Sequence, residues 1–509
     1  MPDFRALQSH FARDKDYPER TFEIQDLTRV LDGTLYDGLK YAFAEEKNGA
    51  NEYVKLADRR PSARTRLCRT VVNDSVAMLF DDDHFPTIEC EDEETRDTVA
   101  KLVKEFGVRG VMIEAATTGS VGSVAILMRV LSERVFLTVQ KTHFLTPKWK
   151  ADAPDTLESV TERYKVKGYA LRELGYSIAD GDLNADFWFQ RVWDSSEEQW
   201  FQPLSVEDAA RKPAPSQPAS IPVRDDSRSV THGLGFVPIV WIKNLPGGNG
   251  VDGEPTFPRE AIDMQIECDY LLSQGGRGLK YQSDPTLVIK EPPFSDGTAG
   301  TSGGTGSGTV KGAANALVVG KEGDAKLLEI TGDSAKTVLD WVRGLRELAL
   351  EGAGGNRSNA DKISAAQSGR AMELMHQSLI NLASKLRISY GDYGLEPLLD
   401  MVVKAATKIR LKDKRGQPLG KLSADKPINL RWPRWFAPTY ADMQTEAITL
   451  DTLRAGNLIS QKTAVKTLVP TYDIHDVDAE IKQISADMPP DVDPATGKPK
   501  QQPISQSED

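Results

Sequence analysis

Residues 333–404 constrain the fold more than any other part of this sequence. Residues 333–351 have apolar side chains at helical spacing. A polar, glycine-rich break follows at 352–362, and a much longer helical pattern opens at Ala365. A helix, an exposed loop and a long helix are an unusual design for an enzyme core. They suit a ring-forming protein that extends a loop into a central hole.

The composition of the 509-residue chain is that of an ordinary globular protein, with 39% hydrophobic and 27% charged residues. This length accommodates roughly two to four structural regions. We find no run of about 18 apolar residues and no signal-peptide layout, so we expect neither a membrane span nor secretion. Cys68, Cys90 and Cys268 form no CxxC pair, which fits a reducing compartment and argues against metal or redox frameworks.

The formal net charge of the chain is −12. A protein that coats DNA carries a basic excess that neutralises phosphates, so this charge argues against that class. It permits a protein that DNA slides past, because a channel with little net attraction holds the duplex without trapping it.

Apolar periodicity predicts an α+β fold. Helices are expected around 27–43, 59–80, 97–106, 259–274, 440–454, 461–468 and 477–485. Strands are expected at 125–130, 136–140, 162–170, 186–193, 200–203 and 235–242. Pro238 places the last strand at a sheet edge or delays its start. Residues 284–330 predict a small unit of short strands, and 408–412 and 427–432 are expected to pair with each other.

Short motifs with catalytic associations lack the context that their chemistry needs. Residues 248–253 match GxGxxG, but Pro255 and Pro258 delay the helix that would meet a pyrophosphate, so we expect a turn. Residues 300–304 match GxSxG inside a Gly/Ser/Thr tract, not at a strand-to-helix turn. The acidic run Asp81–His84 could bind a hard cation through oxygens, but its spacing fits no known loop geometry, and we expect a solvated acidic surface. We therefore expect no catalytic residues, no cofactor and no metal.

Several segments occur in an order that points to one family. Gly233-Leu-Gly-Phe-Val-Pro-Ile-Val-Trp-Ile242 is a strand that leads into the helix at 259–281. The unit 284–330 and the helix 333–351 follow. Ser368-Gly-Arg-Ala-Met-Glu373 opens the long helix, and Ala455-Gly-Asn-Leu-Ile-Ser-Gln-Lys-Thr463 is a helix turn. This order, over roughly residues 59–485, resembles the portal proteins of long-tailed bacteriophages.

The resemblance implies a ring-forming portal fold with named parts. A mixed α/β wing would span 1–255. Two stem helices, 256–283 and 333–352, would flank a small β-containing clip at 284–332. A tunnel loop would occupy 353–366, and a long helix at 367–410 would join the wing to the crown. Residues 411–487 would form a strand pair and the helical crown, and 488–509 a disordered tail.

It also implies a function and partners. The ring, twelve-fold in the virion, would sit at one capsid vertex after assembly in the host cytoplasm. The large terminase subunit would drive double-stranded DNA through its hole, and the DNA would later leave by the same path. A head-completion or adaptor protein, the major capsid protein and the scaffold would bind the ring. The ring itself would perform no bond-making chemistry.

The first candidate site is the tunnel loop. It contains Asn356, Arg357, Ser358, Asn359 and Lys362. These residues offer hydrogen bonds and positive charge, and none of them has an apolar side chain. Contacts to phosphate carry no sequence information, which suits a conduit for any DNA. We expect Arg357 and Lys362 to touch the duplex backbone.

The second candidate site is the pair of stem helices. Glu260, Asp263 and Glu267 share one face, where their like charges are slightly destabilising. Arg343 and Arg346 of a neighbouring subunit are candidate partners, and solvent is an equally good one. The apolar stripe of the second helix consists of Val338, Trp341, Val342, Leu345 and Leu348.

Two other functions stay open at this point. The first is a metal-dependent nuclease or hydrolase that uses Asp81–His84, with the helical half as an oligomerisation platform. The second is another virion structural protein, from the capsid or the tail. The helix, loop and long helix separate a portal from that second option.

Overall fold

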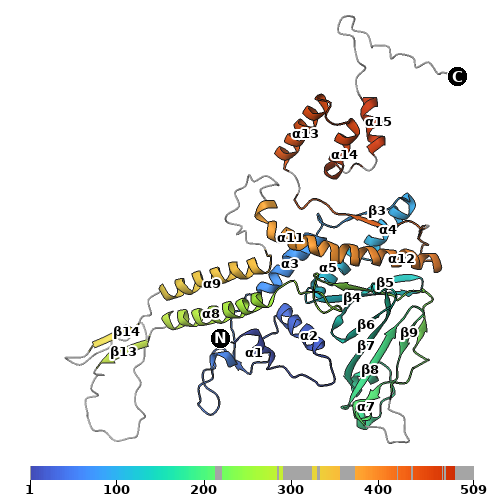
Figure 1. Ribbon diagram of the computed structural model, residues 1–509. Helices are drawn as coiled ribbons and strands as arrows, with labels where there is room; N and C mark the ends of the chain where they lie inside the picture. Colours follow the sequence, from blue (N-terminus) through green and yellow to red (C-terminus); the bar gives the residue numbers. More distant parts are fainter. Residues whose placement is uncertain are drawn as a thin grey trace, which may run out of the picture. The chain divides into compact units, whose positions relative to one another are not determined.

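The computed structural model describes residues 2–211, 221–283, 286–290, 324–328, 333–355, 373–420, 422–436, 439–472, 474 and 477–487. The chain is a mixed α+β protein (Figure 1). It divides into two compact units. The first comprises Met1–Asp74, Glu114–Arg129 and Leu137–Asn356, and the second comprises Ser75–Ile113, Val130–Phe136 and Arg357–Asp509. Each unit is therefore built from segments that are far apart in the sequence.

The first unit holds most of the β-structure. One sheet has the order β11-β9-β8-β7-β6, with β10 paired to β8, and a second has the order β12-β4-β5. The strands of the first sheet are β6 (Leu145–Trp149), β7 (Leu157–Lys167), β8 (Asp186–Trp193), β9 (Glu197–Trp200), β10 (Leu204–Ser205) and β11 (Val230–Thr231). Those of the second are β4 (Ser123–Leu131), β5 (Arg134–Lys141) and β12 (Ile239–Lys243). Pro238 directly precedes β12, which lies at the sheet edge as predicted.

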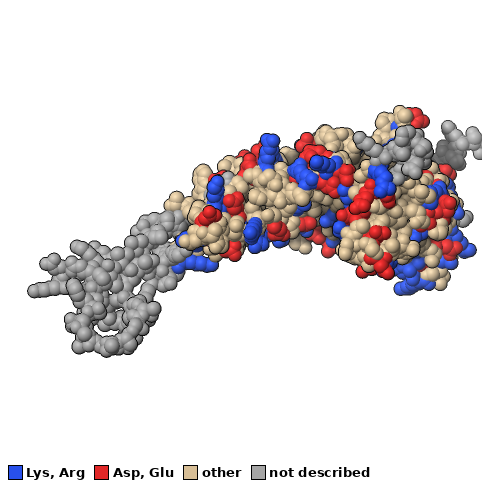
Figure 2. Space-filling model, turned by 90° about the horizontal axis from the view of Figure 1, so that it is seen from below, with Lys and Arg blue, Asp and Glu red and all other residues tan. Residues whose placement is uncertain are grey.

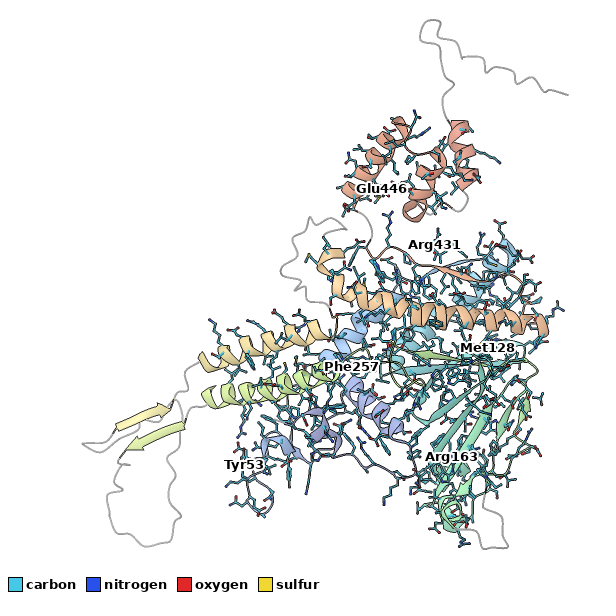
Figure 3. The ribbon with its side chains drawn as sticks, viewed as in Figure 1. Tyr53, Met128, Arg163, Phe257, Arg431 and Glu446 are labelled. Atoms are coloured by element: carbon cyan, nitrogen blue, oxygen red, sulfur yellow. The ribbon has the colours of Figure 1, made fainter. Side chains whose placement is uncertain are left out.

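The two sheets share one apolar core. Leu145, Val160 and Trp193 from the larger sheet pack with Ile239 and Trp241 of β12. Trp193 is only 1% exposed. Figure 3 shows the side chains that fill this region, with Met128 of β4 labelled. Successive residues of β4 and β12 are buried on both faces, so these strands were predictable from their β-branched and aromatic residues between turns.

Helices and small strand pairs complete the first unit. They are α1 (Phe4–Gln8), α2 (Glu19–Asp32), α6 (Gly168–Glu173), α7 (Val206–Ala210), α8 (Arg259–Ser283), α9 (Asp333–Gly352), the parallel pair β1 (Tyr41–Ala42) and β2 (Arg59–Arg60), and the antiparallel pair β13 (Thr286–Lys290) and β14 (Asp324–Leu328). Two further helices, α3 (Leu67–Phe80) and α5 (Val108–Gly119), have residues in both units. The pair β13 and β14 lies within the unit of short strands predicted at 284–330, and the remainder of that unit lies outside the described residues.

A row of buried hydrogen-bond acceptors runs along α8. Gln265, Asp269 and Ser273 are one turn apart and at most 3% exposed. Their side-chain oxygens accept the backbone N–H groups of Cys68 (2.9 Å), Thr65 (2.6 Å) and Ala63 (3.0 Å), respectively. This acceptor row therefore holds the chain that leads into α3, and it supplies partners for amides that a helix start leaves unpaired.

Asp269 is the centre of the acceptor row. Besides the Thr65 amide, it accepts the hydroxyls of Thr65 (2.8 Å) and Tyr36 (2.7 Å). Burial raises the pKa of the Asp269 carboxyl, and the hydrogen bonds from Thr65 and Tyr36 oppose the shift. A second tyrosine, Tyr270, donates to the Arg59 carbonyl at 2.8 Å, so α8 binds segments on both sides.

A buried ion pair fixes α2 against the loops of the β-region. Arg20 contacts both carboxylate oxygens of Asp252 and donates to the carbonyls of Thr142 (3.0 Å) and Leu145 (2.9 Å). Burial alone would raise the pKa of Asp252, but hydrogen bonds from Arg20, Ser123 and Asn249 outweigh it and lower the pKa. The turn at 247–250, where Gly247, Gly248 and Gly250 have positive φ, presents Asp252, as expected for a turn and not a dinucleotide site.

The second unit is centred on a long helical segment. It contains β3 (Thr87–Glu89), α4 (Glu93–Glu105), α11 (Gln377–Arg387), a π-helix (Ile388–Leu395), α12 (Glu396–Lys408), β15 (Asn429–Arg431), α13 (Tyr440–Ala455), α14 (Gln461–Tyr472) and α15 (Val477–Asp487). The three helices at 440–487 lie close to their predicted ranges. The π-helix was not predicted; it lies where Trp432 packs on Gly391, at which a Cβ would be 2.6 Å from the indole ring.

Several sequence-based boundaries were wrong. The helix predicted at 27–43 is α2, which ends at Gly33 in a left-handed conformation (φ 76°). The helix predicted at 59–80 begins only at Leu67, because residues 63–65 are extended along α8 and bound there. The strand β6 was missed. The expected pairing of 408–412 with 427–432 is also wrong: β15 pairs antiparallel with β3, which is far away in the sequence.

We predict that Asp269→Ala lowers the free energy of unfolding by roughly 2–4 kcal/mol, because it leaves two hydroxyls and an amide buried without an acceptor. Asp269→Asn keeps an acceptor oxygen and should lose less. Asp340→Ala, at an exposed acid on α9, is the control and should change stability by less than about 0.5 kcal/mol. Urea unfolding measures all three. Equal stabilities of the Asp269→Ala variant and the parent would contradict the role of the acceptor row.

A pH-dependent prediction concerns His143. Burial, with the nearby charges of Lys141 and Arg20, lowers the pKa of His143 from 6.5 to about 4. Between pH 6.5 and 4 the unfolded chain binds a proton at His143 that the folded chain does not bind. Acidification over this range should therefore lower the free energy of unfolding by up to roughly 3 kcal/mol. His143→Gln should lack this contribution. Parallel pH profiles of the unfolding free energy for the two proteins would refute the prediction.

Candidate functional site

The paired helices α8 and α9 form the first candidate site. α8 leads into β13, and β14 leads back into α9, so the two helices run side by side in opposite directions (Figure 1). Leu67 and Cys268 pack against Val342, Leu345 and Ala349 of α9. The helices approach closely at Gly275, where a Cβ would lie 3.2 Å from a methyl group of Val338.

The apolar stripe predicted on α9 was only partly right. Val342 and Leu345 are buried against α8, but Trp341 is 57% exposed and Leu348 is 52% exposed. Helix geometry separates the exposed residues from the buried ones, because Trp341 and Leu348 lie about 70–90° around the helix from the centre of the buried stripe. Gly344 lies between them in the sequence, and no atom of the described residues is near enough to contact an added Cβ there. α9 therefore has a second apolar face, with a notch at its centre.

The three acidic residues predicted on one face of α8 differ in their contacts. Asp263 accepts the backbone N–H of Phe4 at 2.7 Å and lies 3.9 Å from Arg259, so its own chain satisfies it. Within the described residues, Glu260 and Glu267 make no ion pair. Asp263 thus has partners within its own chain, and its pairing with a neighbouring subunit stays a prediction. Glu260 and Glu267 stay candidates.

The two arginines predicted on α9 also differ. Arg343 pairs with Asp340 at 3.1 Å, and both side chains are more than half exposed, so the pair contributes little to stability. Arg346 is exposed and makes no ion pair among the described residues. Burial, followed by the charges of Asp269 and Glu267, raises the pKa of Cys268 to about 11, and Arg346 opposes the shift. Arg346 therefore lies within electrostatic range of this turn of α8.

The tunnel-loop residues Asn356, Arg357, Ser358, Asn359 and Lys362 lie outside the described residues. The chain that enters the loop is described. Gly354 has a positive φ (67°), and the Gly355 amide donates to the Leu350 carbonyl at 2.7 Å, which ends α9. A Cβ at Gly355 would lie 3.0 Å from Val71 and Leu350. The end of α9 is thereby held against α3.

The acidic run Asp81–His84 is a surface cluster. Asp81 and Asp82 both pair with Arg109, which also donates to the Phe80 carbonyl at 2.9 Å. The His84 ring nitrogen lies 2.9 Å from the Trp435 carbonyl oxygen. In the part of the chain that the structure describes, no three His, Cys, Asp or Glu side chains are grouped as a metal site. The cation-binding alternative therefore has no geometric support here.

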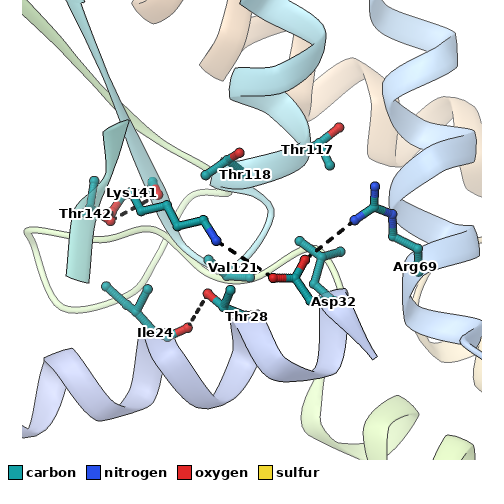
Figure 4. Close-up of a pocket in the computed structure, with 11 residues that line it drawn as sticks. Ile24, Thr28, Asp32, Arg69, Thr117, Thr118, Val121, Lys141 and Thr142 are labelled. Atoms are coloured by element: carbon teal, nitrogen blue, oxygen red, sulfur yellow. Dashed lines mark hydrogen bonds and ion pairs between the residues drawn. The ribbon is translucent and has the colours of Figure 1, made fainter. Parts of the chain in front are cut away.

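A small pocket in the first unit has mixed charge (Figure 4). Its volume is about 190 Å³. Asp32 at the end of α2 lies between Lys141 (3.8 Å) and Arg69 (4.0 Å). The Thr28 hydroxyl is engaged with the Ile24 carbonyl at 2.7 Å, and Thr142 with the Ser123 carbonyl at 3.1 Å. No histidine or cysteine lines the pocket. The Ser123 hydroxyl lies 2.8 Å from that of Thr142 and donates to the Asp252 carboxylate, which Arg20 also binds, so it is held within the fold.

Surface charge on the face shown in Figure 2 is interspersed, with no continuous patch of either sign. None of the described helices has both the length and the apolar composition of a bilayer span. No protein-family model matches the sequence, and no curated protein matches it significantly. The site must therefore be interpreted from its own residues.

A matched pair of leucines tests the two faces of α9. Leu345→Ala should lower the free energy of unfolding by about 2–5 kcal/mol, because it opens a cavity against α8. Leu348→Ala should cost less than about 1 kcal/mol in dilute monomeric protein, yet raise the concentration needed for self-association. Urea unfolding and light scattering measure the two effects. Equal losses of stability would show that both side chains pack within the chain.

Proposed function

We propose that this chain is the portal protein of a tailed bacteriophage. Copies of it would form a ring at one capsid vertex, through which terminase packages double-stranded DNA and from which the DNA is later ejected. The ring would bind head-completion and capsid proteins. In this proposal the chain positions and guides DNA and leaves ATP hydrolysis to the terminase.

One observation carries the proposal: the antiparallel pair α8 and α9, joined through β13 and β14, with α9 ending at residues held against α3. The segment that follows α9 connects it to the long helical run α11, π-helix and α12. A helix pair of this kind, attached firmly at its base, suits a stem that lines a channel. The resemblance of the sequence to portal proteins supports the same interpretation.

The second apolar face of α9 supports self-association. Trp341, Gly344 and Leu348 leave apolar surface and a notch that no described residue of the chain fills. Aromatic side chains such as Trp341 are enriched in interfaces between proteins. Glu260, Glu267 and Arg346, which make no ion pair in the described residues, supply charges of both signs for neighbouring copies.

The alternatives have less support. A nuclease at Asp81–His84 would need free carboxylates, but Arg109 pairs with Asp81 and Asp82. Another virion structural protein would not require a hairpin of long helices followed by a loop and a third long helix. The mixed-charge pocket at Asp32 has no feature that favours a different function.

Electron microscopy of the purified full-length protein tests the proposal. We expect end-on views of rings of about twelve subunits with a central hole, and mass photometry should give the corresponding mass. Rings form because each copy presents two different surfaces to its neighbours. Monomers or dimers at micromolar concentration would overturn the proposal. Divalent-metal-dependent DNA cleavage that is lost in Asp82→Ala would favour the nuclease instead.

A further inference from the structure

The three C-terminal helices of the second unit lack a core of their own. In α13 no side chain is buried, and among the hydrophobic side chains described in α13–α15 only Val465 is buried, at 7% exposed. Tyr440 is 90%, Leu458 73% and Ile448 59% exposed. Helices of this length draw most of their stability from packing an apolar face. These three helices therefore need another apolar surface to pack against.

α13 has two stripes, each with alternating spacings of three and four residues. The inner stripe, Met443, Glu446, Leu450 and Leu453, is half-buried. The Tyr472 hydroxyl of α14 lies 4.0 Å from the Met443 sulfur, and Glu446 (labelled in Figure 3) pairs with Arg434 at 3.4 Å. The inner stripe therefore faces the chain itself.

The outer stripe of α13 is fully exposed. It consists of Ala441, Gln444, Ile448, Asp451 and Ala455. This is the a/d spacing by which one helix packs on another. The two alanines allow a neighbouring helix to approach closely on either side of Ile448. Asp451 makes no ion pair in the described part of the chain, so a helix that covers the stripe must supply a cation.

The exposed face of α14 supplies that cation. It carries Lys462, Thr463, Lys466 and Thr467, and α14 contains no acidic residue. Lys462 already binds Asp478 of α15 at 2.8 Å, whereas Lys466 makes no ion pair among the described residues. Each copy thus has one exposed stripe centred on Ile448 and one basic face, and neither Asp451 of the stripe nor Lys466 of the face has an ion pair among the described residues.

We propose that the outer stripe of α13 in one copy packs on the Lys466 face of α14 in a second copy, with Asp451 paired to Lys466. The two surfaces differ, so the contact is head-to-tail and every copy uses both. In a closed ring, every α13 stripe packs on the α14 face of one neighbour, so both surfaces of every copy are covered. The inference rests on the proposed ring, and it names a contact by which neighbouring subunits complete the C-terminal helices.

The first test compares two aspartates placed one residue apart in the full-length protein. Ile448→Asp puts a charge in the stripe, and Thr449→Asp puts the same charge at an exposed position beside it. Mass photometry over a dilution series should show that Ile448→Asp raises the dissociation concentration about tenfold or more, equivalent to about 1.4 kcal/mol. Thr449→Asp should behave as the parent. Equal behaviour of the two variants would overturn the inference.

The second test exchanges the charges. Lys466→Glu alone should weaken assembly, because it places two acids together, and Asp451→Lys in the same chain should restore it. Circular dichroism checks that every variant keeps its helices. Failure of the double variant to restore a weakened assembly would overturn the Asp451–Lys466 pair.

The outcomes separate this inference from the portal proposal. If Ile448→Asp still forms rings at parental concentrations, the inference fails and the portal proposal stands. If the parent forms a smaller assembly that Ile448→Asp dissociates, the contact stands and the portal proposal fails. A parent that is monomeric at all concentrations would refute both.

Discussion

The acceptor row on α8 is the interaction on which the first unit depends. Gln265, Asp269 and Ser273 bind three backbone amides of the chain that leads into α3, and a buried carboxylate is tolerated only because donors surround it. The same helix binds Phe4 of α1 through Asp263 and Arg59 through Tyr270. α9 then packs on another face of α8. The direction of the helix pair is thereby coupled to segments from across the first unit.

Two helices of this chain share an unusual property. Both α9 and α13 pack one stripe within the chain and leave large apolar side chains exposed on another face, Trp341 and Leu348 in α9 and Ile448 between two alanines in α13. Single exposed apolar residues are common, but ordered stripes at helical spacing indicate a surface that another helix covers. Self-association explains both with one assumption. A ring of copies would cover each of these surfaces with a neighbouring subunit.

Much of the secondary structure was predictable, and the tertiary pairing was not. The helices α8, α9 and α13–α15 and the strand β8 lie at or near their predicted positions, because apolar periodicity and capping residues such as Thr439 and Ser460 are local signals. The start of α3 was misplaced, since extended residues bound to a distant helix carry no local signature. The pairing of β15 with β3 was missed for the same reason, as was the π-helix that accommodates Trp432.

The candidate site also has features that the sequence predicted and features that it did not. The sequence alone determined that this chain has a helix, a glycine-rich break and a long helical segment, and which faces of the helices are apolar or charged, because side-chain spacing follows from helix geometry. Only the tertiary structure decided which charges are available. Asp263 is taken by a backbone amide and Arg343 by Asp340, while Glu267 and Arg346 make no ion pair in the described part of the chain. It likewise decided that Leu345 is buried and Leu348 exposed, since a neighbouring helix can cover only one side of α9.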